Sequence, residues 1–281
     1  MNRTTMALGA VLALVMIARG AAPAVAQPEI GPEFLDRTNR LDGDAITFCI
    51  YPQAPSAPLD RAAAELIAEA LFLDAAFFDI QPTIRVTGLD GIPISEDEVF
   101  IFLTNNCDAL LGMELLTGGV YPEWLTFTAA YASIPYVAIA RAGTYADLFE
   151  VPRDRPIATQ SMTSVDGTVT AFFRTLPADQ AWRRFPLPTS NSVLTRVLDG
   201  TVDAGFIWEP WLQQPYVDPA QITLISTGSL TLPTRNLGMA LQSVDNFLRT
   251  LIDEAIADLT AGGELAQLYL DVMPDVLRRN P

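Results

Sequence analysis

The sequence predicts an α/β protein built of two lobes, and two observations carry this prediction. In residues 190–211, an amphipathic stretch with four apolar residues at helical spacing stops at Gly200, and the apolar run of residues 202–208 follows at once. A helix, a glycine stop and a buried strand make one step of a parallel sheet. Similar steps recur on both sides of residues 127–141, a long apolar stretch without helical periodicity that we expect to be a strand connecting the lobes.

The first lobe is expected to begin with a buried strand at residues 45–51, followed by a proline-rich loop and an amphipathic helix over residues 59–73. Further strands are expected at residues 84–87 and 107–113, with the short apolar segment of residues 99–103 between them. Strand, helix, strand, helix, strand is the order of an α/β lobe.

The second lobe is expected to contain a brief strand at residues 157–159 and then a helix with Val169, Phe172 and Phe173 facing inward. A strand at residues 185–187 leads from there into the helix and strand of residues 190–211. This second set of elements predicts a smaller α/β lobe.

The chain is expected to return to the first lobe at its C-terminal end. A strand at residues 237–241 precedes a helix capped by Ser243 and ended by Gly262 and Gly263, and a last helix covers residues 264–272. Strands rather than flexible linkers join the lobes, which predicts hinge motion. We therefore assign residues 1–26 to a signal peptide, residues 27–138 with 236–281 to lobe 1, and residues 139–235 to lobe 2.

The N-terminal residues read as a secretory signal peptide. Arg3 supplies the positive end, residues 6–17 the apolar core, and residues 24–26 the small-residue cleavage pattern. A membrane anchor is the alternative, but Arg19 and Pro23 interrupt the apolar run below the length that spans a bilayer. We expect a mature protein in the periplasm, with no other segment able to span a membrane.

The strongly acidic composition restricts the partners of the protein. The formal net charge is −16, and removal of a signal peptide with two arginines and no acid would make it −18. Nucleic acids and anionic membranes both require basic surfaces, so we expect no binding to either. The charge instead favours a cationic ligand or a basic protein partner.

The composition also argues against an enzyme. The chain contains no histidine and no lysine, which excludes Ser-His-Asp and Cys-His catalysis, histidine-ligated metals and lysine Schiff bases. A carboxylate pair could catalyse hydrolysis or a dehydratase-like proton transfer, but no acidic pair stands in a recognisable motif. We therefore expect no catalytic residues, no metal and no cofactor.

Cys49 and Cys107 are the only cysteines, and they stand far apart in a chain that we expect to be exported. A structural disulfide is the natural interpretation in an oxidising compartment, with two buried thiols as the alternative.

The order of these motifs resembles the type II, two-lobed periplasmic solute-binding proteins, especially the family that binds amino acids and related polar solutes. The resemblance rests on LTFTAAYASIPYVAIAR at residues 125–141, VLDGTVDAGFI at residues 197–207, and LGMALQSVDNFLRTLIDEAIADLTAGGELAQLYLDV at residues 237–272. It implies a periplasmic-binding-protein-like fold in which each lobe is a mainly parallel sheet flanked by helices. It also implies a monomer that captures a small-molecule solute between its lobes and delivers it to a membrane ABC permease.

Two positions depart from the amino-acid binders of this family. Those proteins usually carry threonine-x-x-arginine before the hinge segment, and this arginine forks the ligand carboxylate, whereas residues 116–124 contain no arginine. They also place an aspartate for the ligand ammonium five residues after the aspartate of the VDA motif. Five residues after Asp203 stands Trp208, so we expect a solute other than a standard amino acid.

The residues Trp208-Glu209-Pro210 are similar to strand ends of two other groups. Binding proteins for sulfonates, nitrate and thiamine precursors often show VDAxxxWEP. The solute-binding-like accessory proteins of PQQ-dependent methanol dehydrogenases show a similar VDxxxxWxP, with a cysteine in the first strand and a cysteine-aspartate strand start, like Cys49 and Cys107-Asp108. This second resemblance implies a periplasmic quinoprotein dehydrogenase as the partner, and no defined small ligand.

The candidate ligand-binding residues stand at strand ends, in the hinge segment and at a helix start. In open α/β sheets the ligand lies beyond the carboxyl ends of the strands, and hydroxyls at a helix start can seat a polar group. Each residue also has a purely structural alternative, namely packing, a solvated acid or helix capping. The candidates are Tyr51, Met113, Glu114, Tyr131, Ser133, Ser161, Thr163, Trp208 and Glu209.

Overall fold

The structure is a computed structural model that describes residues 44–81, 96–116, 118–119 and 121–273. The expected signal peptide and the strand expected at residues 84–87 lie outside the described residues. Within the described ranges, no helix is both long and apolar enough to cross a membrane.

The first lobe is built around the strand β1 (Ala45–Ile50). This strand pairs in parallel with β2 (Asp74–Asp79) on one side and with β3 (Ala109–Glu114) on the other. β10 (Thr234–Gln242) runs antiparallel to β3 and to the short strand β4 (Leu125–Phe127). The expected strands at residues 45–51, 107–113 and 237–241 are thereby confirmed.

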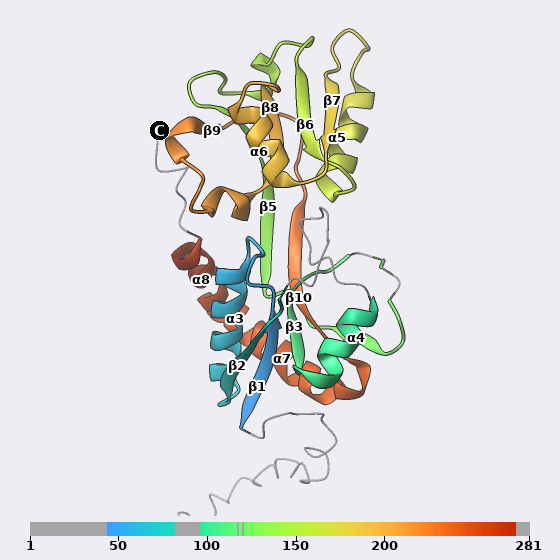
Figure 1. The fold of residues 1–281 in the computed structure, drawn as a ribbon, viewed down its shortest axis with the longest axis vertical. Helices are drawn as coiled ribbons and strands as arrows, with labels where there is room; N and C mark the ends of the chain where they lie inside the picture. The colour runs from blue at the N-terminus through green and yellow to red at the C-terminus, as the bar shows by residue number, and fades with distance from the viewer. Residues whose placement is uncertain (1–43, 82–95, 117, 120, 274–281) are drawn as a thin grey trace, which may run out of the picture. The chain divides into compact units, whose positions relative to one another are not determined.

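Helices cover both faces of this sheet (Figure 1). Phe48 and Leu111 enter one apolar cluster, whereas the neighbouring residues Cys49 and Leu110 enter another, as the alternation of a strand requires. A strand buried on both faces reads as a continuous apolar run, which explains why these strands were visible in the sequence. The first cluster includes residues of α3 (Ala57–Ala70), α7 (Asn246–Gly262) and α8 (Glu264–Val272), and the second includes residues of α4 (Glu96–Asn105).

The second lobe is built around β6 (Pro156–Gln160), which runs parallel to β7 (Arg183–Leu187) and to β8 (Ala204–Trp208). The helices α5 (Ser164–Thr175) and α6 (Ser190–Leu198) flank these strands (Figure 1). α6 approaches β8 so closely that a Cβ on Gly205 would lie 2.6 Å from Val193 Cγ1. The helix and strand expected in residues 190–208 are confirmed, and glycine is required where they touch.

β5 (Ala132–Arg141) connects the two lobes, as expected from residues 127–141. Its first four residues pair antiparallel with β10, and its remaining residues pair with β8 and with the short strand β9 (Ile222–Leu224). One sheet therefore runs through both lobes in the order β2-β1-β3-β10-β5-β8-β6-β7, with β4 beside β10 and β9 beside β5. This arrangement confirms the predicted two-lobed α/β fold class.

Two local features differ from the prediction. β2 was not predicted, because its residues AAFF show no alternation and the helix before it ends without a glycine. The turn between them contains Phe72, with φ +58°. The prediction that Ser243 caps the long C-terminal helix was wrong. Ser243 begins a short 3-10 turn (Ser243–Asp245), and α7 begins after it, at Asn246.

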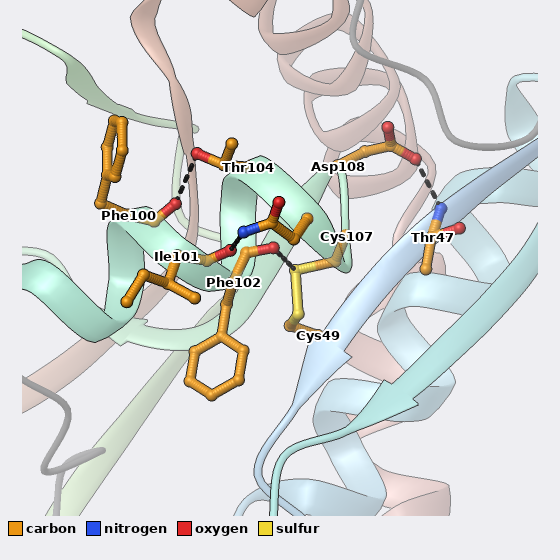
Figure 2. Close-up of a disulfide and its surroundings, with 9 residues drawn as sticks. Thr47, Cys49, Phe100, Ile101, Phe102, Thr104, Cys107 and Asp108 are labelled. Atoms are coloured by element: carbon orange, nitrogen blue, oxygen red, sulfur yellow. Dashed lines mark hydrogen bonds between the residues drawn. A yellow bond between two sulfur atoms is a disulfide. The ribbon is translucent and has the colours of Figure 1, made fainter.

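The disulfide between Cys49 and Cys107 is present, as predicted (Figure 2). It ties β1 to the residues just before β3, and both cysteines are buried. Beside it, the Asp108 carboxylate accepts a hydrogen bond of 2.8 Å from the Thr47 backbone N–H, while Asp108 N–H donates to the Thr47 carbonyl at 2.8 Å. Three links thus hold the start of β3 against β1.

Replacing both cysteines in the double variant C49A/C107A is expected to lower the free energy of unfolding by about 2–5 kcal/mol, because the bridge closes a loop with a sequence separation of 58. Urea unfolding of the variant and of the oxidised wild type measures this difference. The wild type with reducing agent provides the control, and an unchanged midpoint in both would contradict the prediction.

Candidate functional site

A buried arginine stands where the strands of the two lobes meet. Arg235, on β10, is only 3% exposed, and its Nε lies 3.0 Å from Glu114 Oε2 at the end of β3. The contact has the distance of an ion pair without the alignment of a hydrogen bond. On its other side, the guanidinium carbon lies 4.2 Å from the ring centroid of Trp208, the last residue of β8. Arg235 therefore contacts the strand ends of both lobes.

The sheet explains why these three residues meet. Leu237 of β10 pairs with Glu114, and Arg235 lies two residues earlier on the same strand, opposite Ile134 of β5. Two residues further along β5, Tyr136 pairs with Trp208. The carboxyl ends of β3 and β8 therefore face the same stretch of β10, which is the edge where open α/β sheets bind ligands.

A second carboxyl group lies buried beside this cluster. Asp60, in the first turn of α3, accepts hydrogen bonds from Tyr131 Oη at 2.6 Å and from Ser56 Oγ at 2.8 Å. Tyr131 Oη in turn accepts a hydrogen bond of 2.9 Å from the Gly112 N–H. Burial raises the pKa of Asp60 to about 6, although the two hydroxyl groups and the positive charge of Arg235 oppose the shift.

The Tyr131 hydroxyl is held in its protonated state. Burial, and after it the Asp60 carboxylate, raises the pKa of Tyr131 well above its ordinary value. The phenol therefore acts as a permanent hydrogen-bond donor to Asp60. We name the five residues Asp60, Glu114, Tyr131, Trp208 and Arg235 the Arg235 cluster.

Two indole N–H groups around the end of β8 are buried without an acceptor in the part of the chain that the structure describes. They belong to Trp208, which is 1% exposed, and to Trp211 in the following 3-10 turn (Glu209–Gln213). A buried donor without a partner is rare in native proteins and is often satisfied by water or a ligand. Within the described residues, no group of three or more Cys, Asp or Glu side chains is placed to hold a metal ion.

Glu209 makes a separate link between the lobes. Its Oε2 accepts a hydrogen bond of 2.7 Å from Tyr269 Oη on α8. The residue after the Trp208 strand end is therefore tied to the C-terminal helix of the first lobe.

The other predicted site residues lie outside the Arg235 cluster. Tyr51 and Met113 pack against the apolar cluster that contains the disulfide. Ser133, which is exposed, donates to Asn236 Oδ1 at 2.7 Å. Thr163 caps α5 by accepting from the Asp166 N–H, and the Ser161 N–H donates to the Leu187 carbonyl. Whether any of these residues contacts a solute stays a prediction.

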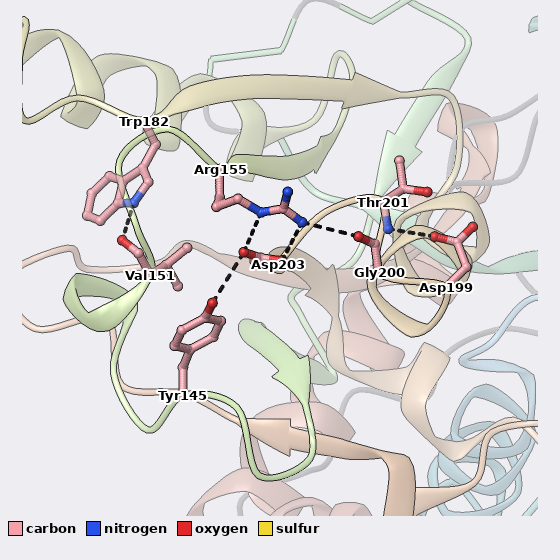
Figure 3. Close-up of polar contacts among 8 residues, drawn as sticks. All are labelled: Tyr145, Val151, Arg155, Trp182, Asp199, Gly200, Thr201 and Asp203. Carbon is pink, nitrogen blue, oxygen red and sulfur yellow. Dashed lines mark hydrogen bonds and ion pairs between the residues drawn. The ribbon is translucent and has the colours of Figure 1, made fainter.

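The aspartate of the VDA motif has a structural role (Figure 3). The Asp203 carboxylate accepts from Arg155 at 2.7 Å and 2.9 Å and from Tyr145 Oη at 3.2 Å. The hydrogen bonds from Arg155 hold the pKa of Asp203 below its ordinary value. Asp203 stands just before β8, so this network fixes the strand end that does not carry Trp208.

Neither Arg235 nor Asp60 is among the site residues predicted from the sequence. A signal for Arg235 was present, because it is an isolated charge beside the apolar strand at residues 237–241. A signal for Asp60 was weaker, since an acid in the first turn of a helix is favourable without any further role.

No protein-family profile and no curated protein matches the chain. Solved structures do match it. The probable amino-acid ABC transporter extracellular-binding protein YtmK of Bacillus subtilis has a TM-score of 0.61 at 12% identity, covering 82% of this chain and 98% of its own. An amino acid ABC transporter substrate-binding protein of Streptococcus pneumoniae, bound to L-arginine, has a TM-score of 0.54 at 16% identity, covering 85% and 97%.

The VFT2 domain of BvgS from Bordetella pertussis is also similar, with a TM-score of 0.56 at 15% identity, covering 80% of this chain and 91% of that domain. At these identities the likeness shows the fold alone. The chain therefore has the two-lobed fold that these binding proteins share.

The variant Asp60→Asn is expected to change how stability depends on pH. The pKa of Asp60 is raised in the folded protein, so its contribution to stability is fully present below its unfolded value of 3.8 and is lost as pH rises through about 6. Relative to the variant, the wild type should lose roughly 3 kcal/mol between acidic and neutral pH. Unfolding free energies of both proteins across this range measure the effect, and a constant difference between them would contradict it.

Proposed function

We propose that the protein is a periplasmic solute-binding protein that captures a small polar solute between its two lobes for an ABC-type import system. The observation that carries the proposal is the Arg235 cluster. It gathers a buried cation, two carboxyl groups and an aromatic ring at the strand ends of both lobes. The shared two-lobed fold supports it, because several of the similar structures are substrate-binding proteins of ABC transporters.

The way the lobes are joined supports a binding cycle. β5 and β10 both cross between the lobes, and small rotations of such strands can move one lobe against the other. A solute that contacts Glu114 on one side and Trp208 on the other favours the arrangement in which both are close. In that arrangement a monomer would present both lobes to a membrane permease.

The proposed activity is binding rather than catalysis. Of the three groups in the cluster that could exchange protons, Asp60 and Tyr131 hydrogen-bond to each other at 2.6 Å and are buried. The third, Glu114, is paired with Arg235. The chain has no histidine or lysine to assist them. The hydrogen-bonded pair is therefore suited to holding the cluster in place.

We further propose that the solute is not a standard amino acid. The arginine and the aspartate that the family places around a zwitterion are absent from residues 116–124 and from position 208. The charged groups that are present, Arg235 and Glu114, stand on other strands and contact each other, so they define a different geometry.

A second candidate function is an accessory role beside a periplasmic PQQ-dependent alcohol dehydrogenase. The internal pairing of Arg235 with Glu114 favours it, since a site that satisfies its own charges has less need of a solute. The formal charge of −16 suits a basic protein partner.

The first experiment is native mass spectrometry of the protein isolated from its own periplasm. A small adduct released on activation is expected, and its mass identifies the solute. With that solute, the variant Trp208→Ala should bind about tenfold more weakly or worse, because the ring contacts the guanidinium that the solute approaches. Calorimetric titration measures the affinities.

The matched control is Trp124→Ala, a half-buried tryptophan of the first lobe that packs against Phe100. Trp208→Phe retains a ring and tests binding if the alanine variant unfolds. Equal affinities for wild type and both Trp208 variants would refute the site assignment.

The accessory role predicts a complex with the co-encoded dehydrogenase that forms at low salt and dissociates as salt rises, because screening weakens attraction between surface charges. Size-exclusion chromatography of the mixed proteins at two salt concentrations tests this. Absence of a complex at low salt would exclude the accessory role.

A further inference from the structure

Arg235 is a fixed cation. Its side chain is 3% exposed, its strand is paired with β3 and β5 on either side, and its guanidinium lies over Trp208. Moving a buried charge away from its partners costs several kcal/mol, because the charges left behind lose their compensation. The guanidinium therefore stays in place while other groups exchange around it.

Glu114 is the partner that can move. It is the last residue of β3, and its side chain is 28% exposed, against 3% for that of Arg235. A carboxylate at a partly exposed strand end can rotate into water at small cost, because water then solvates the carboxylate in place of the arginine. The second carboxyl group, Asp60, is already held by Tyr131 and Ser56.

Two groups of the Arg235 cluster, the Arg235 guanidinium and the Trp208 indole N–H, can only donate hydrogen bonds. A guanidinium has five N–H donors and no acceptor, and an indole nitrogen donates only. Trp208 Nε1 is buried, and no acceptor for it lies among the described residues. A group that enters beside Arg235 therefore needs acceptor oxygens and a negative charge.

We infer that the solute is a small organic anion, and that its carboxylate or sulfonate replaces the Glu114 carboxylate beside Arg235 and accepts from the Trp208 indole N–H. This inference rests on the proposed solute-binding function and narrows it to one chemical class. Glu114 is then an internal competitor: it neutralises Arg235 in the empty protein and leaves when the solute binds.

The opposite class, a cationic solute, fits the cluster less well. A cation would have to take the face of Trp208 and the carboxylate of Glu114, both of which Arg235 already occupies. A cation would therefore have to displace Arg235, which is buried and held in a strand, whereas an anion displaces Glu114, which is partly exposed.

The variant Glu114→Gln tests the inference because it removes the competitor and retains the shape of the side chain. The control Glu254→Gln removes the same charge from an exposed position on α7 of the same lobe. The probes are benzoate, acetate and methanesulfonate, with benzylammonium and guanidinium as cations, all titrated at constant ionic strength and neutral pH. Tryptophan fluorescence and the thermal unfolding midpoint report binding.

The expected result is that Glu114→Gln binds at least one of the anions about tenfold more tightly than Glu254→Gln does, and gains no affinity for the cations. The double variant E114Q/R235Q removes the cation together with its Glu114 partner and should lose this gain. Equal anion affinities in the two single variants would overturn the inference, as would a gain that persists in the double variant.

Failure of this inference is distinguishable from failure of the proposed function. A solute adduct without an acidic group, found by native mass spectrometry, would overturn the inference and leave solute binding standing. A complex with a dehydrogenase and no adduct of any charge would instead remove the proposed function.

Discussion

The antiparallel pairing of β5 with β10 holds the two lobes in one sheet, and the contacts of the candidate site depend on it. Through this pairing Arg235 lies opposite Ile134. The same strand β5 then continues into the second lobe, where Tyr136 pairs with Trp208. A shift of one residue in this register would turn Arg235 to the other face of the sheet and separate it from Trp208. The strand pairing that joins the lobes therefore also positions Arg235 beside Trp208.

The charges of the Arg235 cluster are more consistent with exchange than with stabilisation. A buried ion pair contributes little to stability, because the loss of hydration offsets the attraction between the charges. Arg235 and Glu114 would therefore add little to the fold that an apolar pair could not supply. What the pair provides is a buried cation with a carboxylate that lies partly in water. Asp60 and Tyr131 are not available for exchange, because the Tyr131 hydroxyl donates to the Asp60 carboxyl group and both residues are buried.

The second lobe shows how the same residue types serve structure alone. The ion pair of the Asp203 carboxylate with Arg155, at 2.7 Å, is shorter than that of Glu114 with Arg235, and Tyr145 also donates to Asp203. This network stands at the start of β8, away from the strand ends that face the other lobe. Position along the strand therefore distinguishes a structural ion pair from a candidate binding group, and composition does not.

Much of the fold could be predicted because its signals are local. The helix, glycine stop and apolar run around Gly200 became α6 and β8, and the apolar stretch before Arg141 became the connecting strand β5. β2 escaped prediction, since the break before it, at Phe72, uses a positive φ without glycine. Ser243 was misassigned because a short 3-10 turn separates it from the helix.

The sequence alone was enough to predict the α/β class, the two lobes, the connecting strand and a disulfide between Cys49 and Cys107, which the structure contains. The tertiary structure alone decided which charges meet. Asp60 and Tyr131 are 71 positions apart, and Glu209 and Tyr269 are 60 apart. Periodicity reports only which face of its own element a residue occupies, whereas such contacts depend on the order and register of strands that are distant in the chain.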